Sequence, residues 1–325
     1  MRKIASRGLV LAAFVMVIGS PTSGSPAYAA ETLHVAKAAA TASPIIPVNV
    51  GYKLGIFAKH GLDLKIADFA GGGKAMQAMT AGSIDISISA GPEMALIAKG
   101  APAKAICDAA PPITFIGIAV PWDSPVHKIG QLKGKKIGIS SIGSLTDWLT
   151  LQLAQHEGWG PHGVTPVAIG NGTASIIAAF RTHAVDADVA VTSLVFNMEA
   201  NKQGRLLIPA SKFVGNLAAG TIYASDHLIA TDPGAVRRFI AAWLETIDFI
   251  RTHKTEAIKL ESEVTGFPVS VQTKEYDLTI GMYSKDCKFD AESLSTLKRS
   301  FVDLKLLSAP PDMSKLYTEA FLPKR

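Results

Sequence analysis

The sequence has few of the residues that metal centres, disulfide scaffolds or hydrolytic sites require. Its 325 residues include only Cys107 and Cys287, which excludes a disulfide-rich scaffold and leaves open either one bridge or two buried thiols. The eight histidines are scattered and form neither H-E-x-x-H nor a close Cys/His spacing, so we expect no metal. No G-x-S-x-G motif is present to support a serine hydrolase. We therefore expect no enzymatic activity and no cofactor.

A strong excess of charge is also missing once the first residues are set aside. The formal net charge is +5, but Arg2, Lys3 and Arg7 supply three of the cations, and the remaining 29 Lys and Arg nearly balance 27 Asp and Glu. Nucleic acid is therefore not an expected partner, although the composition is basic overall.

Long hydrophobic runs are absent beyond the N-terminal stretch. There, a basic segment precedes an apolar run from Leu9 to Gly19, and Ala27-Tyr28-Ala29 has the small-x-small pattern of a signal-peptidase site. The run is shorter than the roughly 20 residues that span a membrane. We expect residues 1–29 to be a cleaved signal peptide and, because no Cys lies at the cut, an unlipidated protein in the periplasm.

The rest of the chain alternates between strand and helix patterns, which predicts an α/β fold. About 296 residues favour two lobes rather than one core. We expect residues 30–119 to form the first part of lobe 1, 120–220 to form lobe 2, and 221–325 to return to lobe 1 and add C-terminal helices. The predicted strands are 33–39, 62–69, 84–89, 135–140, 164–169, 187–192 and 221–225, and the main predicted helices are 47–60, 74–81, 92–99, 144–156, 173–182 and one containing 236–250.

Glycine- and serine-rich turns follow several of the predicted strands. In open α/β sheets, ligands bind beyond the carboxyl ends of the strands, where helix N-termini offer unpaired N–H groups. Each turn alone is ordinary loop chemistry, but their repetition in both halves favours a small polar or anionic ligand held between the lobes. The turns are 71–73, 89–91, 140–144, 170–173 and 192–193.

Two further features bear on the ligand. Gly170-Asn171-Gly172 resembles the start of a dinucleotide fingerprint, but Ser175 stands where its third glycine would be, which disfavours nucleotide binding. Trp122, beside the predicted hinge, is a candidate for lining the cleft against an aromatic or alkyl group. Trp148 is a weaker candidate, because its spacing with neighbouring leucines favours the core.

Several short motifs resemble those of a known family in the same order and spacing. They are KLGIFAKHGLDL (53–64), AGSID (81–85), Ser124-Pro125 with 131–140, Gly143 to Trp148, and Val185-Asp186-Ala187. Together they resemble the NitT/TauT (sulfonate, nitrate, taurine) group of ABC-transporter substrate-binding proteins, whose superfamily includes thiamine-pyrimidine binders. One departure is His183-Ala184, where the family usually places a glycine, and we expect it to affect only the local turn.

The resemblance implies a type II periplasmic-binding-protein fold, with two open, mostly parallel sheets joined by two hinge crossings. It further implies a monomer that closes on a small anion, sulfonate being the leading expectation, and delivers it to an ABC permease and ATPase. An aromatic or pyrimidine-like ligand is an alternative, and a pyrimidine-synthase-like enzyme is disfavoured because such enzymes need a cysteine-rich motif. The implied ligand contacts are Ser43, Pro44, Gly72, Gly73, Gly91, Ser140, Ser141, Gly143, Ser144 and Thr192, to which we add Trp122.

Overall fold

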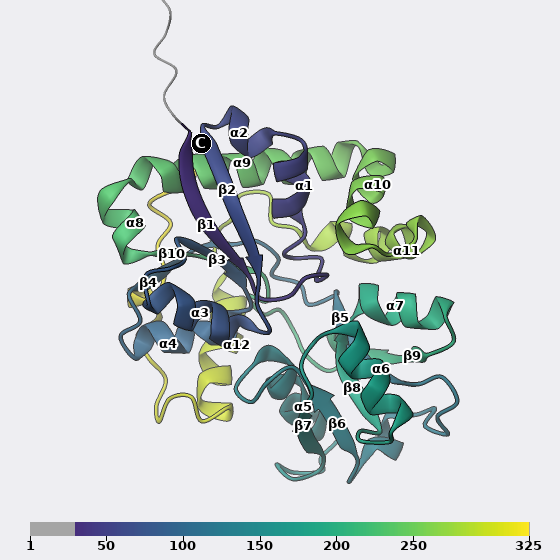
Figure 1. The fold of residues 1–325 in the computed structure, drawn as a ribbon. Helices are drawn as coiled ribbons and strands as arrows, with labels where there is room; N and C mark the ends of the chain where they lie inside the picture. Colours follow the sequence, from purple (N-terminus) through teal and green to yellow (C-terminus); the bar gives the residue numbers. More distant parts are fainter. Residues whose placement is uncertain (1–29, 325) are drawn as a thin grey trace, which may run out of the picture.

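The computed structural model describes residues 30–324 and contains two five-stranded mixed sheets flanked by helices (Figure 1). The expected signal peptide lies outside the described residues. The strand order is β2-β1-β3-β10-β4 in the first sheet and β7-β6-β8-β5-β9 in the second. This confirms the predicted α/β class, whereas the exact limits of the two lobes stay a prediction. No described helix is long and apolar enough to cross a membrane.

The first sheet is built from the N-terminal quarter of the described chain and one strand from much later. Its strands β1, β2 and β3 are parallel, as short strand–helix–strand units require. The elements are β1 (Glu31–Lys37), α1 (Pro47–Lys53), α2 (Ile56–Lys59), β2 (Leu62–Asp68), α3 (Gly72–Thr80), β3 (Ile86–Ser89), η1 (Gly91–Glu93), α4 (Met94–Ala98) and β4 (Ala103–Asp108).

The second sheet follows from the next hundred residues and repeats this plan. Its strands β6, β7 and β8 are parallel, and β5 runs antiparallel between β8 and β9. The elements are β5 (Ile116–Pro121), η2 (Ile129–Leu132), β6 (Lys136–Ile139), α5 (Leu145–His156), β7 (Thr165–Ala168), α6 (Thr173–Arg181), β8 (Ala187–Val191), α7 (Thr192–Ala200), β9 (Gly204–Pro209) and η3 (Ala210–Lys212).

The chain then crosses back, as predicted, through β10 (Thr221–Ser225), which inserts antiparallel between β3 and β4. The crossing strands β5 and β10 are thus the antiparallel members of two otherwise parallel sheets. The remaining chain is helical, and its long helix packs against α1 and α2. These last elements are α8 (Asp226–Thr231), α9 (Pro233–Thr252), α10 (Lys254–Thr265), α11 (Val269–Thr279), η4 (Ile280–Met282), α12 (Ala291–Asp303) and η5 (Met313–Lys315).

A disulfide joins Cys107 in β4 to Cys287 in the loop before α12, which settles the alternative left open by the sequence. The buried face of α9 includes Phe239 and Trp243, as its helical spacing predicts, and the ring of Phe239 contacts the ring of Phe57 in α2 in a tilted arrangement, with 5.2 Å between the ring centroids. Trp148 is fully buried, in agreement with its core spacing.

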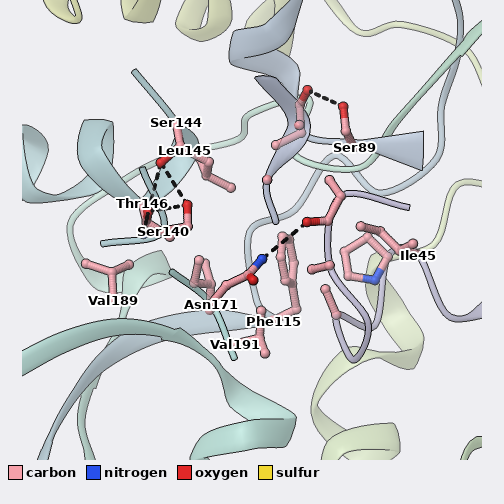
Figure 2. Close-up of a pocket in the computed structure, with 18 of the residues that line it drawn as sticks. Ile45, Ser89, Phe115, Ser140, Ser144, Leu145, Thr146, Asn171, Val189 and Val191 are labelled. Atoms are coloured by element: carbon pink, nitrogen blue, oxygen red, sulfur yellow. Dashed lines mark hydrogen bonds between the residues drawn. The ribbon is translucent and has the colours of Figure 1, made fainter. Parts of the chain in front are cut away.

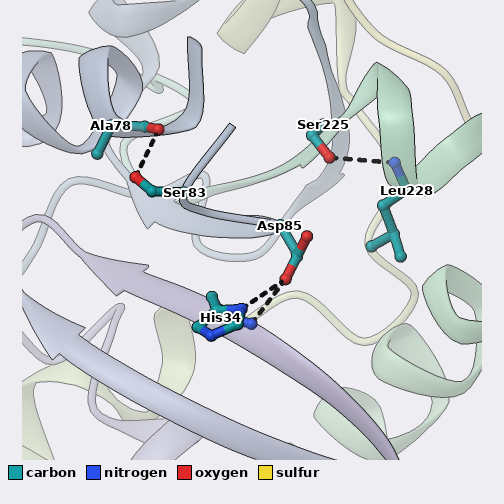
Figure 3. Close-up of polar contacts among 6 residues, drawn as sticks. All are labelled: His34, Ala78, Ser83, Asp85, Ser225 and Leu228. Carbon is teal, nitrogen blue, oxygen red and sulfur yellow. Dashed lines mark hydrogen bonds and ion pairs between the residues drawn. The ribbon is translucent and has the colours of Figure 1, made fainter. Parts of the chain in front are cut away.

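Two aspartates of the recognisable motifs hold equivalent strands in place. Asp85, just before β3, accepts a hydrogen bond from the backbone N–H of His34 in β1 at 2.8 Å, and its own N–H donates to the His34 carbonyl (Figure 3). Asp186, just before β8, has the same pair of bonds with Lys136 of β6. Each aspartate therefore fixes the register of a central strand at the amino end of its sheet, and the role of these motifs is structural.

Three local expectations differ from the structure. The single helix predicted over residues 47–60 is two helices, because Gly55 takes a left-handed conformation with φ of 70° and interrupts the hydrogen bonding. Strands β4, β5 and β9 are not among the predicted strands. His183 has φ of 55°, so the turn that usually carries glycine keeps its left-handed geometry with a bulkier residue.

Candidate functional site

A cavity lies between the two sheets, at the carboxyl ends of their parallel strands. Its walls come from the ends of β1, β3, β6 and β8 and from the first turns of α3 and α5, which is where open α/β sheets bind ligands. The cavity leaves about 80 Å³ for the centres of water-sized molecules. Since roughly 10–15 Å³ of such space holds one water, the cavity fits a small solute and not a polymer.

Three hydroxyl groups cluster on the wall from the second sheet. Ser140 follows β6, Ser144 caps α5, and Thr146 lies in the first turn of that helix. Their oxygens are 2.8–3.0 Å apart, as Figure 2 shows. A cap residue and the free N–H groups of a twelve-residue helix give this wall a partial positive potential. The cluster can therefore donate hydrogen bonds to an acceptor or anionic group of a ligand.

The wall from the first sheet carries Glu93, the one ionisable side chain among the described residues that line the cavity. Its side chain lies in the space that a Cβ on Gly72 would occupy, because such a Cβ would be 2.2 Å from Glu93 Oε1. Glu93 Oε2 is buried without a hydrogen-bond partner in the described part of the chain. Burial raises the pKa of this carboxyl to about 8, against a small opposing effect of its own backbone N–H.

The remaining lining is largely apolar, with Phe115 from the first crossing, Ile45, Leu145 and Val189 among its members (Figure 2). Such a surface suits the hydrocarbon part of a ligand. Specificity must then come from the few polar groups, namely Glu93 on one wall and the hydroxyl cluster on the other.

Hydrogen bonds connect the two walls around the cavity. The amide of Asn171, after β7, donates to the carbonyl of Ala38 at 3.2 Å (Figure 2). The hydroxyl of Ser193 in α7 donates to the carbonyl of Thr41 at 2.9 Å. Further out, Lys274 of α11 forms an ion pair with Glu199 of α7 at 2.7 Å. The described conformation therefore brings the two halves into direct contact.

The structure brings only part of the predicted site together. Four of the eleven predicted contacts line the cavity: Pro44, Gly72, Ser140 and Ser144. The other seven do not: Ser43, Gly73, Gly91, Ser141, Gly143, Thr192 and Trp122.

Several of these seven are already engaged within the protein. The hydroxyl of Ser43 donates to the buried carboxyl of Glu275 in α11. Thr192 is fully buried, and its backbone N–H donates to the carbonyl of Phe115 at 2.8 Å. The N–H of Gly143 donates to Asp147 at 2.8 Å, so it is not free for a ligand.

Gly91, Gly73 and Ser141 lie outside the cavity lining. Gly91 packs against the carbonyl of Ala218, which a Cβ would approach to 2.4 Å, and a Cβ on Gly73 would meet nothing within 4 Å. Ser141 is half-buried at the rim, where its hydroxyl would lie 3.5 Å from a Cβ on Gly71. These residues shape the turns around the cavity without forming its surface.

The position expected for Trp122 needs a correction. It was placed beside the hinge, but β5 begins at the hinge with Ile116, which pairs with Val191, and ends at Pro121 on the far side of the sheet. Trp122 follows that far end and is 43% exposed. The strand runs away from the cavity because it is the antiparallel crossing strand, a direction that the local sequence does not reveal.

Sequence reasoning missed Glu93, Thr146 and Phe115 as lining residues, and it named Asn171 only within a turn. The signal for Asn171 and Thr146 was present, since both lie in or next to the glycine- and serine-rich turns. Glu93 follows Gly91-Pro92 directly, but nothing local distinguishes it from a solvated acid in a first helical turn. The described residues contain no group of three or more His, Cys, Asp or Glu side chains that could hold a metal ion.

The chain has a two-lobed α/β fold, and solved structures share it. The alkanesulfonate-binding protein SsuA from Xanthomonas axonopodis pv. citri superposes with a TM-score of 0.74 at 19% identity, covering 86% of this chain and 94% of that chain. The aliphatic sulphonate binding protein SsuA from Escherichia coli gives 0.72 at 19% identity, covering 89% and 92%. The desulfurization enzyme DSZB shares the fold at 0.63 and 15% identity, covering 90% and 97%.

The sequence itself assigns the family. Residues 43–257 match the family model described as NMT1/THI5 like, so the chain belongs to that family. A protein of Brucella abortus (strain 2308), named only as a binding protein, is 25% identical over 236 residues, which are 67% of this chain and 71% of that protein. The expected resemblance to the NitT/TauT type of binding protein is thereby confirmed.

Proposed function

We propose that the protein is the solute-binding subunit of an ABC importer and that it captures a small ligand outside the cytoplasmic membrane. The observation that carries this proposal is the cavity between the two sheets, which takes its lining from strand ends of both. Family membership and the similarity to sulfonate-binding proteins support it. The partners would be a permease and an ATPase, and the location the periplasm, as the N-terminal sequence suggests.

Capture would occur by closure of the two halves about the crossings between β4 and β5 and between β9 and β10. The bonds of Asn171 and Ser193 to backbone carbonyls of the other half would form as the halves meet. Each neutral hydrogen bond contributes about 0.5–1.5 kcal/mol, so a few of them bias closure without locking it. A ligand that contacts both walls would supply the remaining free energy that favours the closed form.

The proposed ligand carries an acceptor or anionic group, with a sulfonate as the leading candidate. The hydroxyls of Ser140, Ser144 and Thr146 and the N-terminus of α5 would receive that group. The apolar lining, with Phe115, leaves room for an alkyl or aromatic body. An aromatic or pyrimidine-like ligand therefore remains the alternative within the same binding role.

An enzymatic role is not part of the proposal. The similarity to DSZB extends to the fold alone at 15% identity. Both cysteines are joined in the disulfide, so neither provides a thiolate nucleophile. The cavity lining of the described chain holds several hydroxyls and the Glu93 carboxyl, but no hydrogen bond joins a hydroxyl to that carboxyl as a nucleophile and general base would require.

A thermal-shift screen of the purified protein tests the proposal. The compounds would be alkyl- and arylsulfonates, taurine, nitrate, bicarbonate, aromatic carboxylates and pyrimidines. A ligand at about 100 times its dissociation constant should add roughly 2.7 kcal/mol of stability, which is a clear rise in unfolding temperature. A folded protein that responds to no compound class would contradict the proposed function.

A further inference from the structure

Glu93 is a buried carboxyl in the cavity, and one of its two oxygens has no partner among the described residues. Its side chain is 6% exposed, and Oε2 has no hydrogen-bond partner among the described residues. A buried polar group without a partner is costly and rare in native proteins. Burial with no partner at the wall of a binding cavity indicates that the missing partner comes from outside the chain.

The described side chains around Glu93 do not supply a donor to its Oε2. The hydroxyl of Tyr223 in β10, the titratable group that faces Glu93, donates instead to the carbonyls of Ala90 at 2.9 Å and Gly91 at 3.3 Å. Lys37, at the end of β1, already pairs with Asp68 at 3.0 Å. No Lys, Arg or His is among the described residues that line the cavity.

The absence of a side chain at Gly72 leaves the space that the Glu93 carboxyl occupies. Gly72 begins α3 directly against the end of the Glu93 side chain, and any larger residue there would collide with it. Glu93 itself lies in a 3-10 helix held by Pro92 and followed at once by α4. The side chain is thus held beside the ligand space by rigid elements on both sides.

A carboxylate in such a place selects for an N–H donor, and most strongly for a cationic one, because charge-assisted hydrogen bonds are about twice as strong as neutral ones. Resting on the proposed function, we propose that the ligand of this cavity carries a protonated nitrogen, an amine or amidine on a small apolar body, that donates to Glu93. The hydroxyls of the cluster on the opposite wall bond to one another, and by rotating they would donate to an acceptor group at the other end of the same ligand.

Binding of such a ligand should release a proton. The pKa of Glu93 is about 8 in the free protein, so at pH 7 about nine in ten molecules carry the proton. An ammonium or amidinium group favours the carboxylate and expels that proton, whereas a ligand with only a sulfonate does not. Tyr223 stays neutral throughout, because burial and the nearby Glu93 raise its pKa further.

The experiment uses two sets of matched probes and isothermal titration calorimetry. The first set is ethylamine, ethanesulfonate and 2-aminoethanesulfonate, and the second is benzylamine, benzenesulfonate and 4-(aminomethyl)benzenesulfonate. Each is titrated into wild type, Glu93→Gln and Glu261→Gln at pH 7, in two buffers that differ in ionisation enthalpy. Glu261 is the matched control, because it is equally buried, its pKa is also raised to about 8, and it does not line the cavity.

We expect at least one amine-bearing probe to bind wild type with release of close to one proton. Glu93→Gln should weaken that binding about ten- to a hundredfold, and Glu261→Gln should leave it unchanged. Proton release is measured on wild type alone, so the test holds even if Glu93→Gln folds poorly. If sulfonate-only probes bind as tightly as their amine-bearing partners, this inference is overturned and the proposed function still stands. If no probe in either set binds, the inference is also overturned, and the wider thermal-shift screen then decides the proposed function.

Discussion

Two adjacent glycines at the start of α3 offer a direct test of how Glu93 is held. A Cβ at Gly72 would lie 2.2 Å from Oε1 and 2.3 Å from Cδ of Glu93, whereas a Cβ at Gly73 would meet nothing within 4 Å. Neither glycine has the positive φ that would make alanine strained. The variants Gly72→Ala and Gly73→Ala therefore differ mainly in whether the new methyl group collides with Glu93.

The magnitudes follow from the two environments. Alanine in a helix is favoured over glycine by roughly 0.5–1 kcal/mol, so Gly73→Ala should be neutral or slightly stabilising. Gly72→Ala gains the same helix preference but overpacks the wall of the cavity, which typically costs about 1–3 kcal/mol. Gly72→Ala should thus unfold more easily than Gly73→Ala, by about 1–3 kcal/mol in urea denaturation.

A second readout reports on Glu93 itself. Because its pKa in the folded state is about 8 and its ordinary value is 4.5, folding favours the protonated form. The stability associated with this proton is present at acidic pH and is lost as the pH rises from about 4.5 to 8. Gly72→Ala should shrink this pH dependence by pushing the carboxyl out of its site. Equal stability and equal pH profiles in both variants would refute the reasoning.

Three further predictions concern other parts of the molecule. Burial raises the pKa of Glu275 to about 7, so the stability of the folded protein should fall as the pH rises from about 4.5 to 7. Glu275→Gln should make the unfolding temperature less dependent on pH in this range, and an unchanged dependence would contradict the prediction. Asn171→Ala removes a bond between the two halves worth about 1 kcal/mol, so calorimetry should show roughly fivefold weaker binding of any probe that binds wild type, whereas Asn201→Ala, which loses a bond to its own helix, should not. Replacing both Cys107 and Cys287 with alanine opens a link across 180 residues and should lower the free energy of urea unfolding by about 2–5 kcal/mol, with a loss below 1 kcal/mol arguing against a stabilising role.

The sequence was sufficient to predict the parallel part of each sheet but not the outer strands beyond the crossings. The predicted strands have buried aliphatic residues with clear boundaries, and local pattern was enough to find them. The missed strands β4 and β9 lie at the edges of their sheets beside the antiparallel crossing strands, and the third missed strand, β5, is itself a crossing strand. Their pairing depends on where the chain crosses, which is a tertiary property.

The site, too, could be predicted only in part from the sequence. The turns around the cavity could be located because glycine and serine mark strand-to-helix junctions locally. The importance of Glu93 could not be read from its neighbours, because its burial depends on Gly72 in another unit of the fold and its lack of a donor depends on Tyr223, far along the chain. Trp122 shows the converse error, since an aromatic residue near a crossing can lie at either end of the crossing strand.

The resemblance to the family is strongest where the fold requires particular residues, and this explains why it identifies the fold better than the ligand. Asp85 and Asp186 belong to the recognisable motifs, and both hold strand register at the amino ends of the sheets. The ligand cavity lies at the opposite, carboxyl ends, where Glu93 and the hydroxyl cluster contribute the polar groups. Substitutions at the aspartates should therefore weaken folding first, whereas substitutions at Glu93 should change which ligand binds. Glu93 thus lies outside the recognisable motifs and away from these two aspartates, whereas the hydroxyl cluster of Ser140, Ser144 and Thr146 lies within the motifs 131–140 and Gly143 to Trp148.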